Sequence, residues 1–417
     1  MMLWESIENA LWGAFVGDAL GMPSHWYYTD DELKRDFPDG IRGYQAPPHP
    51  HPSSFLVGAR YQPDTDSATA LSRPYDILQE HARFYRTSYS HFGFTTDARE
   101  QAHGNAAAGE PERYHYHHGL EAGENTLGAD LLRLLMRSVT QHGGYSQTGF
   151  LSDFTGFMTT PGAIPDPYRE TYLRKWFEAY ATGTAPENCA EHQRHRWSIA
   201  SHGGMIRPLA LALLNVDNPP LATGMAMTHQ QLTHRSELVS AGLAVFIPML
   251  LRLINGEALT RVITDTAPTV RKPAITGEEL GREYREAGGP GNIDHDRMWR
   301  MHMAYNGTVA DLVDAARESD RQSLPHPFAR ACYPEHGIPL ILWIARIHGG
   351  DLYESLCTNA MIGGDTVHRG MILGMLLGAI QPVDESLRKG LVHHEAIQAD
   401  IRGFVDMALS GQGHLAV

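Results

Sequence analysis

Apolar residues recur at helical spacing along most of the chain. In residues 4–17, Ile7, Leu11 and Phe15 stand four positions apart, and residues 127–139 show a similar pattern. The same periodicity predicts further helices at 168–180, 209–214, 233–253, 277–287, 306–318, 337–348, 351–361, 366–380 and 394–409, and a possible helix at 75–85. The alternation typical of strands is scarce. The sequence therefore predicts an all-α protein, built as a compact multi-helix assembly.

Residues 38–119 interrupt this helical pattern. They include a proline-rich tract at 47–52 and an aromatic and imidazole cluster at 114–118. A loop-rich segment of this length is usually functional or disordered, and its many aromatic residues argue against disorder. We interpret 38–119 as an ordered, loop-rich insertion or lid. Because no linker separates two cores, we expect residues 1–417 to form a single domain.

Composition and charge narrow the function classes. The formal net charge is −14 and no basic stripe is visible, so a nucleic-acid partner is not expected. Three cysteines without a CxxC pair favour a reducing compartment, and we expect a cytoplasmic protein. No signal peptide is recognised, and the apolar run 241–254 is too short to span a membrane. The oligomeric state is left open.

Polar side chains that could bind a ligand or take part in catalysis cluster near residue 365, where a buried helix is expected to begin. A Gly363-Gly364 turn precedes Asp365, Thr366 and His368, and a helix rich in small residues follows. Free N–H groups and the helix dipole favour anions at such a position. Asp365 or Thr366 could equally well be a simple helix cap.

Two other segments carry similar polar groups. Glu124-Asn125-Thr126 precedes the helix at 127–139, and His25-Trp26 follows the first helix. The cluster at 114–118 contributes His115, His117 and His118.

The order of four motifs along the chain resembles the ADP-ribosylglycohydrolase superfamily, which includes the ADP-ribosyl hydrolases and dinitrogenase-reductase-activating glycohydrolases. The motifs are Gly17-Asp18-Ala19-Leu20-Gly21, Ser201-His202-Gly203-Gly204-Met205-Ile206-Arg207-Pro208, Thr233-His234 and Gly363-Gly364-Asp365-Thr366. This resemblance implies an all-α fold with a central cleft. It also implies two Mg²⁺ ions held by carboxylate and hydroxyl oxygens, and cleavage of an N- or O-glycosidic bond to ADP-ribose.

The metal motifs depart from the family pattern. His25 stands where the opening motif has an acid, and Glu124-Asn125-Thr126 aligns with the end of a Thr-Asp-Asp-Thr motif. Val367 and His368 replace the second Asp and the final Thr of the last motif. The ligand set for two Mg²⁺ ions is thus incomplete. We expect either no metal or a single divalent ion, with Glu124, Asn125, Asp365 and His368 as its candidate ligands.

Two hypotheses follow for the function. In the first, a rebuilt site hydrolyses the glycosidic bond of a small nucleoside-like or ADP-ribosyl compound, with Glu124 and Asp365 as the catalytic carboxylate pair. The predicted substrate-binding residues are then Asp18, His25, Trp26, His115, His117, His118, Asn125, His202, Thr366 and His368. In a variant of this hypothesis, the imidazoles at 25 and 368 recruit one transition-metal ion. In the second, the chain is an inactive binding or scaffold protein of the same fold.

Overall fold

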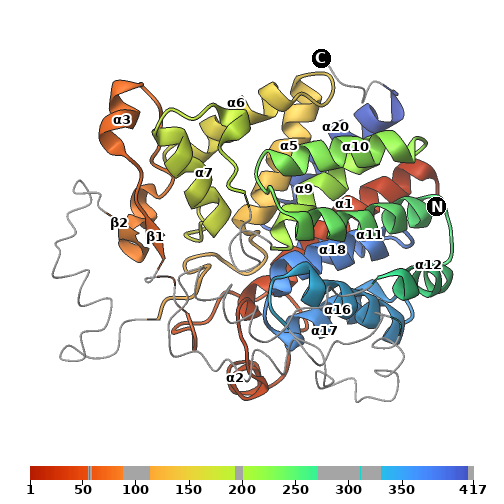
Figure 1. Ribbon diagram of the computed structural model, residues 1–417. Helices are drawn as coiled ribbons and strands as arrows, with labels where there is room; N and C mark the ends of the chain where they lie inside the picture. The colour runs from red at the N-terminus through yellow and green to blue at the C-terminus, as the bar shows by residue number, and fades with distance from the viewer. Residues whose placement is uncertain are drawn as a thin grey trace.

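Helices make up nearly all regular structure in the computed structural model, which describes residues 1–54, 56, 59–87, 113–192, 201–270, 310 and 330–411. Figure 1 shows this all-α architecture. The α-helices are α1 (Leu3–Gly21), α2 (Asp30–Asp36), α3 (Thr65–Ala70), α5 (Leu127–Gln141), α6 (Gln147–Thr159), α7 (Thr171–Ala181), α9 (Gly203–Ala212), α10 (Pro219–Gln231), α11 (Glu237–Ile254), α12 (Leu259–Thr266), α16 (Pro334–Ile347), α17 (Leu352–Ile362), α18 (Thr366–Gly378), α19 (Glu385–Lys389) and α20 (His394–Leu409). The predicted fold class is confirmed.

Short elements connect these helices. The 3₁₀ turns are η1 (Met22–Ser24), η3 (Gln79–Phe84), η5 (Pro186–Asn188), η6 (Leu213–Asn215) and η7 (Ala267–Thr269). Strands β1 (Arg60–Tyr61) and β2 (Arg86–Thr87) pair in parallel, with Arg60 opposite Arg86.

The centre of the fold is a pair of helices from opposite ends of the chain, α1 and α18, which lie side by side in Figure 1. Glycines every four residues on both helices let the two backbones touch. A Cβ added to Gly13 would lie 2.0 Å from the carbonyl oxygen of Gly374. One added to Gly17 would lie 2.2 Å from that of Gly370. This antiparallel contact places the end of α1 beside the start of α18.

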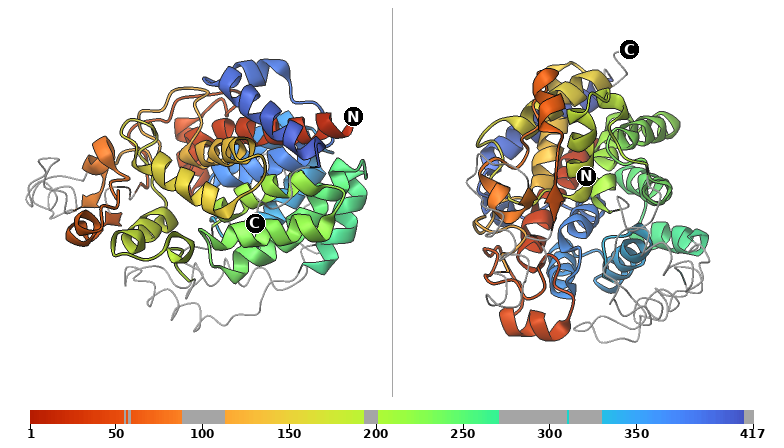
Figure 2. Two further views of the ribbon diagram at one scale, coloured as in Figure 1. Left: turned by 90° about the horizontal axis from the view of Figure 1, so that it is seen from above. Right: turned by 60° about the vertical axis from the view of Figure 1, so that its left-hand side comes forward.

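In the described part of the chain, seven further helices contact this pair. They are α5, α9, α11, α16, α17, α19 and α20. Figure 2 shows the same arrangement from two other directions, with α3 and the short strands beside α7 at one end. One large apolar cluster runs through these elements, so the two central helices are buried on nearly all sides.

The helix boundaries correct some of the predictions. The helix expected at 168–180 begins at Thr171, and the one expected from 233 begins at Glu237, because residues 233–236 form the turn before it. Residues 79–84 form a 3₁₀ turn in place of an α-helix. Helices α2, α3, α6, α10, α12 and α19 were not predicted. The helices expected at 277–287 and 306–318 lie outside the described residues, apart from residue 310.

The described part of the 38–119 segment is joined to the main core. Its buried side chains include Tyr61, Ile77, Phe84 and Tyr116, all of which belong to the central apolar cluster. Its middle, residues 88–112, lies outside the described residues. The single-domain boundaries proposed from the sequence remain a prediction.

Helix α11 is longer than the apolar run predicted there. Among the described residues it alone is long and apolar enough, by length and composition, to cross a membrane, and 56% of it is buried inside the protein. Core helices pass the same test, and α11 packs against α9, α10 and α16. All three cysteines are free.

Candidate functional site

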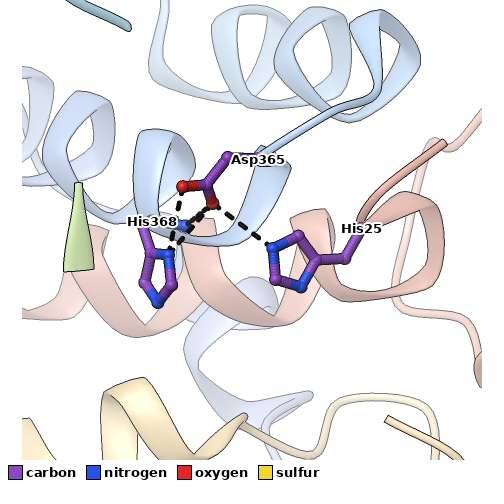
Figure 3. Close-up of side chains that lie close together, drawn as sticks. All are labelled: His25, Asp365 and His368. Carbon is purple, nitrogen blue, oxygen red and sulfur yellow. Dashed lines mark hydrogen bonds and ion pairs between the residues drawn. The ribbon is translucent and has the colours of Figure 1, made fainter. Parts of the chain in front are cut away.

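Asp365 is both a helix cap and the centre of a polar cluster. Its carboxylate accepts a hydrogen bond from the backbone N–H of His368 (3.1 Å) and so caps the first turn of α18. The same carboxylate meets three imidazoles: His368 Nδ1 at 3.0 Å, His202 Nδ1 at 3.1 Å and His25 Nε2 at 3.3 Å. Figure 3 shows His25 and His368 converging on Asp365. The two roles that the sequence left open are therefore combined.

The Gly363-Gly364 turn brings His25 to Asp365. Both glycines have positive φ, and a Cβ on Gly364 would lie 1.8 Å from a backbone oxygen. The turn is tied to the segment after α1, because Gly364 N–H donates to Tyr27 O (2.6 Å) and Trp26 N–H donates to Gly364 O (2.8 Å). His25 is held beside the start of α18 by these bonds.

His25 is the first member of a hydrogen-bonded series of buried side chains. Its Nδ1 lies 2.6 Å from Nε2 of His117. Nδ1 of His117 in turn lies 3.0 Å from the carboxylate of Asp166. All three side chains are buried. Asp166 also accepts the backbone N–H of Leu127 (2.8 Å) and so caps the first turn of α5.

A further carboxylate, Glu170, lies on the other side of His368. Its Oε1 is 3.4 Å from His368 Nε2, and its Oε2 accepts a hydrogen bond from Ser201 Oγ (3.1 Å). The Glu170 side chain is 15% exposed, whereas that of Asp365 is fully buried. Glu170 is thus the more accessible carboxylate of the two.

Four helices begin at this cluster. Thr126, Glu170, His202 and Asp365 are the residues just before α5, α7, α9 and α18 respectively. The free N–H groups and the positive dipole ends of these helices favour negative charge at this point. This convergence explains how several carboxylates can be buried together.

The imidazoles and carboxylates of the cluster shift one another's pKa values. Burial alone would raise the pKa of Asp365, but His368, His202 and His25 outweigh burial and hold that pKa well below the usual value. The pKa of Glu170 is likewise lowered, because His368 outweighs burial. Burial lowers the pKa of His25 to about 3. The pKa of His368 is raised well above its usual value, because Asp365 and Glu170 outweigh burial.

A small cavity opens beside the cluster. Its volume is about 10 Å³, enough for roughly one water molecule. The lining residues are His25, His117, Thr126, Leu127, Gly128, Leu131, Asp166, Tyr168, Glu170, Leu173, Val367 and His368. The central cleft expected for the fold is therefore narrow here, and a sugar ring can enter only if some of the lining groups move.

Three of the predicted substrate-binding residues hold helices together. Asp18 accepts hydrogen bonds from the side chain of Asn125 (2.8 Å), and from the N–H (2.8 Å) and hydroxyl (2.6 Å) of Thr126. Asn125 also donates to Phe15 O at 2.9 Å. The hydroxyl of Thr366 donates to Gly21 O at 2.6 Å. Asp18, Asn125 and Thr366 thus join α1 to the starts of α5 and α18.

Two further predicted residues, Trp26 and His115, contact the imidazole chain, whereas His118 packs elsewhere. Trp26 stacks on His25, with ring centroids 4.5 Å apart. Nε2 of His115 lies 3.0 Å from Pro23 O, and its Nδ1 accepts the backbone N–H of His117 (3.0 Å). His118 packs against Tyr114 and is not among the residues that line the cavity. Trp26 and His115 therefore position His25 and His117.

The structure does not bring Glu124 to Asp365. The Glu124 carboxylate accepts a hydrogen bond from the backbone N–H of Glu121 (2.8 Å) in an exposed turn. In the structure the two carboxylates that contact His368 are Glu170 and Asp365, one at each ring nitrogen, and Glu124 is not one of them. Glu124 and Asn125 likewise do not join His368 and Asp365 as metal ligands.

Sequence reasoning missed Asp166, Tyr168 and Glu170. Asp166 lies just before the helix predicted at 168–180, and Tyr168 and Glu170 lie at the start of that predicted helix. The one available signal was an acidic residue just before a helix, which usually indicates a cap. Only the folded chain shows that this cap faces His368.

The contact of Asp18 with α5 predicts a large stability effect. Asp18→Ala would leave three buried donors of Asn125 and Thr126 without an acceptor, and we expect the free energy of unfolding to fall by about 3 kcal/mol or more. Asp18→Asn keeps one acceptor oxygen and should cost about 1 kcal/mol. Urea denaturation of both variants tests this. Equal losses for Ala and Asn would show that the acceptor is not what matters.

The donors at this site do not suit two Mg²⁺ ions. Mg²⁺ is held by oxygen ligands at near-octahedral geometry. Here Asp365 faces three imidazoles, and Val367 packs into an apolar cluster with Met22 and Leu120. A side chain buried among apolar groups offers no ligand atom. The paired Mg²⁺ site that the family resemblance implies is therefore not built by these residues.

Comparison with known proteins agrees with the fold. A sequence model described as ADP-ribosylglycohydrolase matches residues 3–413. A solved structure titled "ADP-ribosylglycohydrolase-related protein complex" superposes with a TM-score of 0.55 at 15% sequence identity, covering 97% of this chain and 99% of that chain. No curated protein matches the sequence.

Proposed function

The chain belongs to the ADP-ribosylglycohydrolase family, and we propose that it hydrolyses an N- or O-glycosidic bond of a small nucleoside-like or ADP-ribosyl compound. The observation that supports this most directly is the carboxylate of Glu170. It is the most exposed of the three carboxylates in the cluster, it lies at the cavity wall, and it is 3.4 Å from His368.

Glycoside hydrolysis passes through a transition state in which the sugar carries positive charge. A carboxylate beside the anomeric carbon stabilises that charge, or attacks the carbon to form a covalent intermediate. We propose Glu170 for this role, and the hydroxyl of Ser201 donates a hydrogen bond to one of its oxygens. The bond from the anomeric carbon to the leaving nitrogen or oxygen breaks, and water adds its hydroxyl to that carbon. The proton that the water loses balances the proton that the leaving group takes up.

The surroundings of Glu170 suit such a reaction. Tyr168 and the imidazole of His117 line the same cavity and offer stacking surfaces. The helix N-termini around the cluster provide fixed dipoles that need no reorganisation during the reaction. A second candidate, a binding or scaffold protein without activity, would use the same cavity without bond cleavage.

A substrate panel separates these two functions. We expect purified protein to release free sugar from at least one member of a panel of nucleosides and ADP-ribosyl compounds, assayed with and without added Mg²⁺ or Mn²⁺. Release would be measured by chromatography of the products. Tight binding of a panel member by calorimetry, with no sugar released from any of them, would favour the binding protein.

A further inference from the structure

We propose that Nε2 of His25, Oδ1 of Asp365 and Nδ1 of His368 form a binding site for a single transition-metal dication. These three atoms lie within 4.8 Å of one another, and all three side chains are buried. The ligands come from opposite ends of the chain, one after α1 and two at the start of α18 (Figure 3). The site does not depend on the proposed reaction.

The distances between the ligand atoms suit one ion. An ion with bonds of about 2.1 Å separates its neighbouring ligands by about 3.0–3.4 Å in octahedral or tetrahedral geometry. Here the carboxylate oxygen is 3.0 Å from the nitrogen of His368 and 3.3 Å from the nitrogen of His25. Two of the three separations therefore match those around a bound ion, and the two nitrogens lie within 4.8 Å of each other.

One ligand atom has only a poorly aligned partner, the carboxylate of Asp365 at 3.3 Å. Nε2 of His25 is buried and makes no hydrogen bond of acceptable geometry, although it points toward Asp365. Burying a polar atom in this state costs free energy. A metal bond at this position would satisfy the nitrogen.

The second ring nitrogen of each proposed histidine ligand has a polar partner, as is common in metal sites. A ligating histidine usually presents its second ring nitrogen to a carboxylate or another polar group, which fixes the ring. The second nitrogen of His368 faces Glu170 at 3.4 Å. The second nitrogen of His25 faces His117 at 2.6 Å, and His117 faces Asp166.

The remaining oxygen of the carboxylate is also held. Oδ2 of Asp365 lies 3.1 Å from Nδ1 of His202, whose Nε2 lies 2.9 Å from Tyr333 O. Each of the three ligands therefore has its own supporting partner.

The donor set selects the class of ion. Two imidazoles and one carboxylate suit Fe²⁺, Co²⁺ or Zn²⁺, whereas Mg²⁺ prefers oxygen ligands. The cavity of about 10 Å³ is lined by His25 and His368, so it provides space for about one water molecule next to the ion.

Cobalt titration of the metal-free protein tests this site without any substrate. After removal of metals with a chelator, we expect Co²⁺ to bind at one equivalent and to give visible d–d absorption bands, which Zn²⁺ should abolish by competition. Mg²⁺ in excess should leave the bands unchanged. Absence of the bands, or their loss on adding Mg²⁺, would overturn the proposal.

Variants assign the bands to the three ligands. His25→Gln and His368→Gln should each lower Co²⁺ affinity by at least 100-fold, and Glu170→Gln by about 10-fold, because it supports His368 from behind. His142→Ala removes an exposed imidazole elsewhere and should leave binding unchanged. Circular dichroism would show that each variant is folded. Bands that persist in folded His25→Gln and His368→Gln would place the metal elsewhere and overturn the assignment.

Discussion

Glu170→Gln is expected to lower kcat/KM for the substrate found in the panel by about 10³-fold. The amide cannot carry the negative charge that stabilises the sugar in the transition state, nor can it attack the anomeric carbon. Gln has the size of Glu and can still accept the hydrogen bond from Ser201. We therefore expect the melting temperature to change little. Steady-state kinetics and a thermal melt measure the two effects separately.

Glu124→Gln is the matched control for this prediction. The sequence predicts that Glu124 is catalytic, whereas the structure places its carboxylate in an exposed turn with Glu121. We expect Glu124→Gln to keep a rate near that of the unmodified protein. If Glu170→Gln retained full activity while Glu124→Gln lost it, the sequence-based assignment would be right and the geometric one wrong.

The sequence predicts the central helices well because their signals are local. The glycines of α1 and α18 stand at four-residue spacing, which shows which face can meet another backbone. The sequence does not show that the two glycine faces meet each other, because more than 300 positions separate them. Helices such as α10, with its mixed pattern of Met, Thr and Gln, lack a clear apolar stripe and were missed.

Part of the candidate site can also be predicted from the sequence. Asp365, His25 and His368 are found from the sequence because the family motifs mark their positions, and the structure brings them together. Glu170 has no such motif here. Its importance depends on a contact between the starts of α7 and α18, and tertiary contacts of this kind leave no periodic trace in one sequence.

Gly374→Ala is expected to lower the free energy of unfolding by about 3 kcal/mol or more. The new Cβ would lie 2.0 Å from the carbonyl oxygen of Gly13 and 2.4 Å from its carbonyl carbon. Backbone atoms cannot rotate out of the way as a side chain can, so α1 and α18 must separate. Because both helices are buried on most sides, that separation disturbs the packing of the surrounding helices as well. Urea denaturation followed by circular dichroism measures the loss.

Gly224→Ala is the control, because the chemical change is the same and the surroundings are open. Gly224 lies within α10, is exposed, and an added Cβ there would meet no atom within 4 Å. Alanine favours helix over glycine by about 1 kcal/mol, so this variant should gain roughly 0.5–1 kcal/mol of stability. The two substitutions should therefore shift the denaturation midpoint in opposite directions. A Gly374→Ala protein as stable as the Gly224→Ala protein would mean that α1 and α18 do not meet backbone to backbone, and the placement of Asp365 beside the end of α1 would lose its basis.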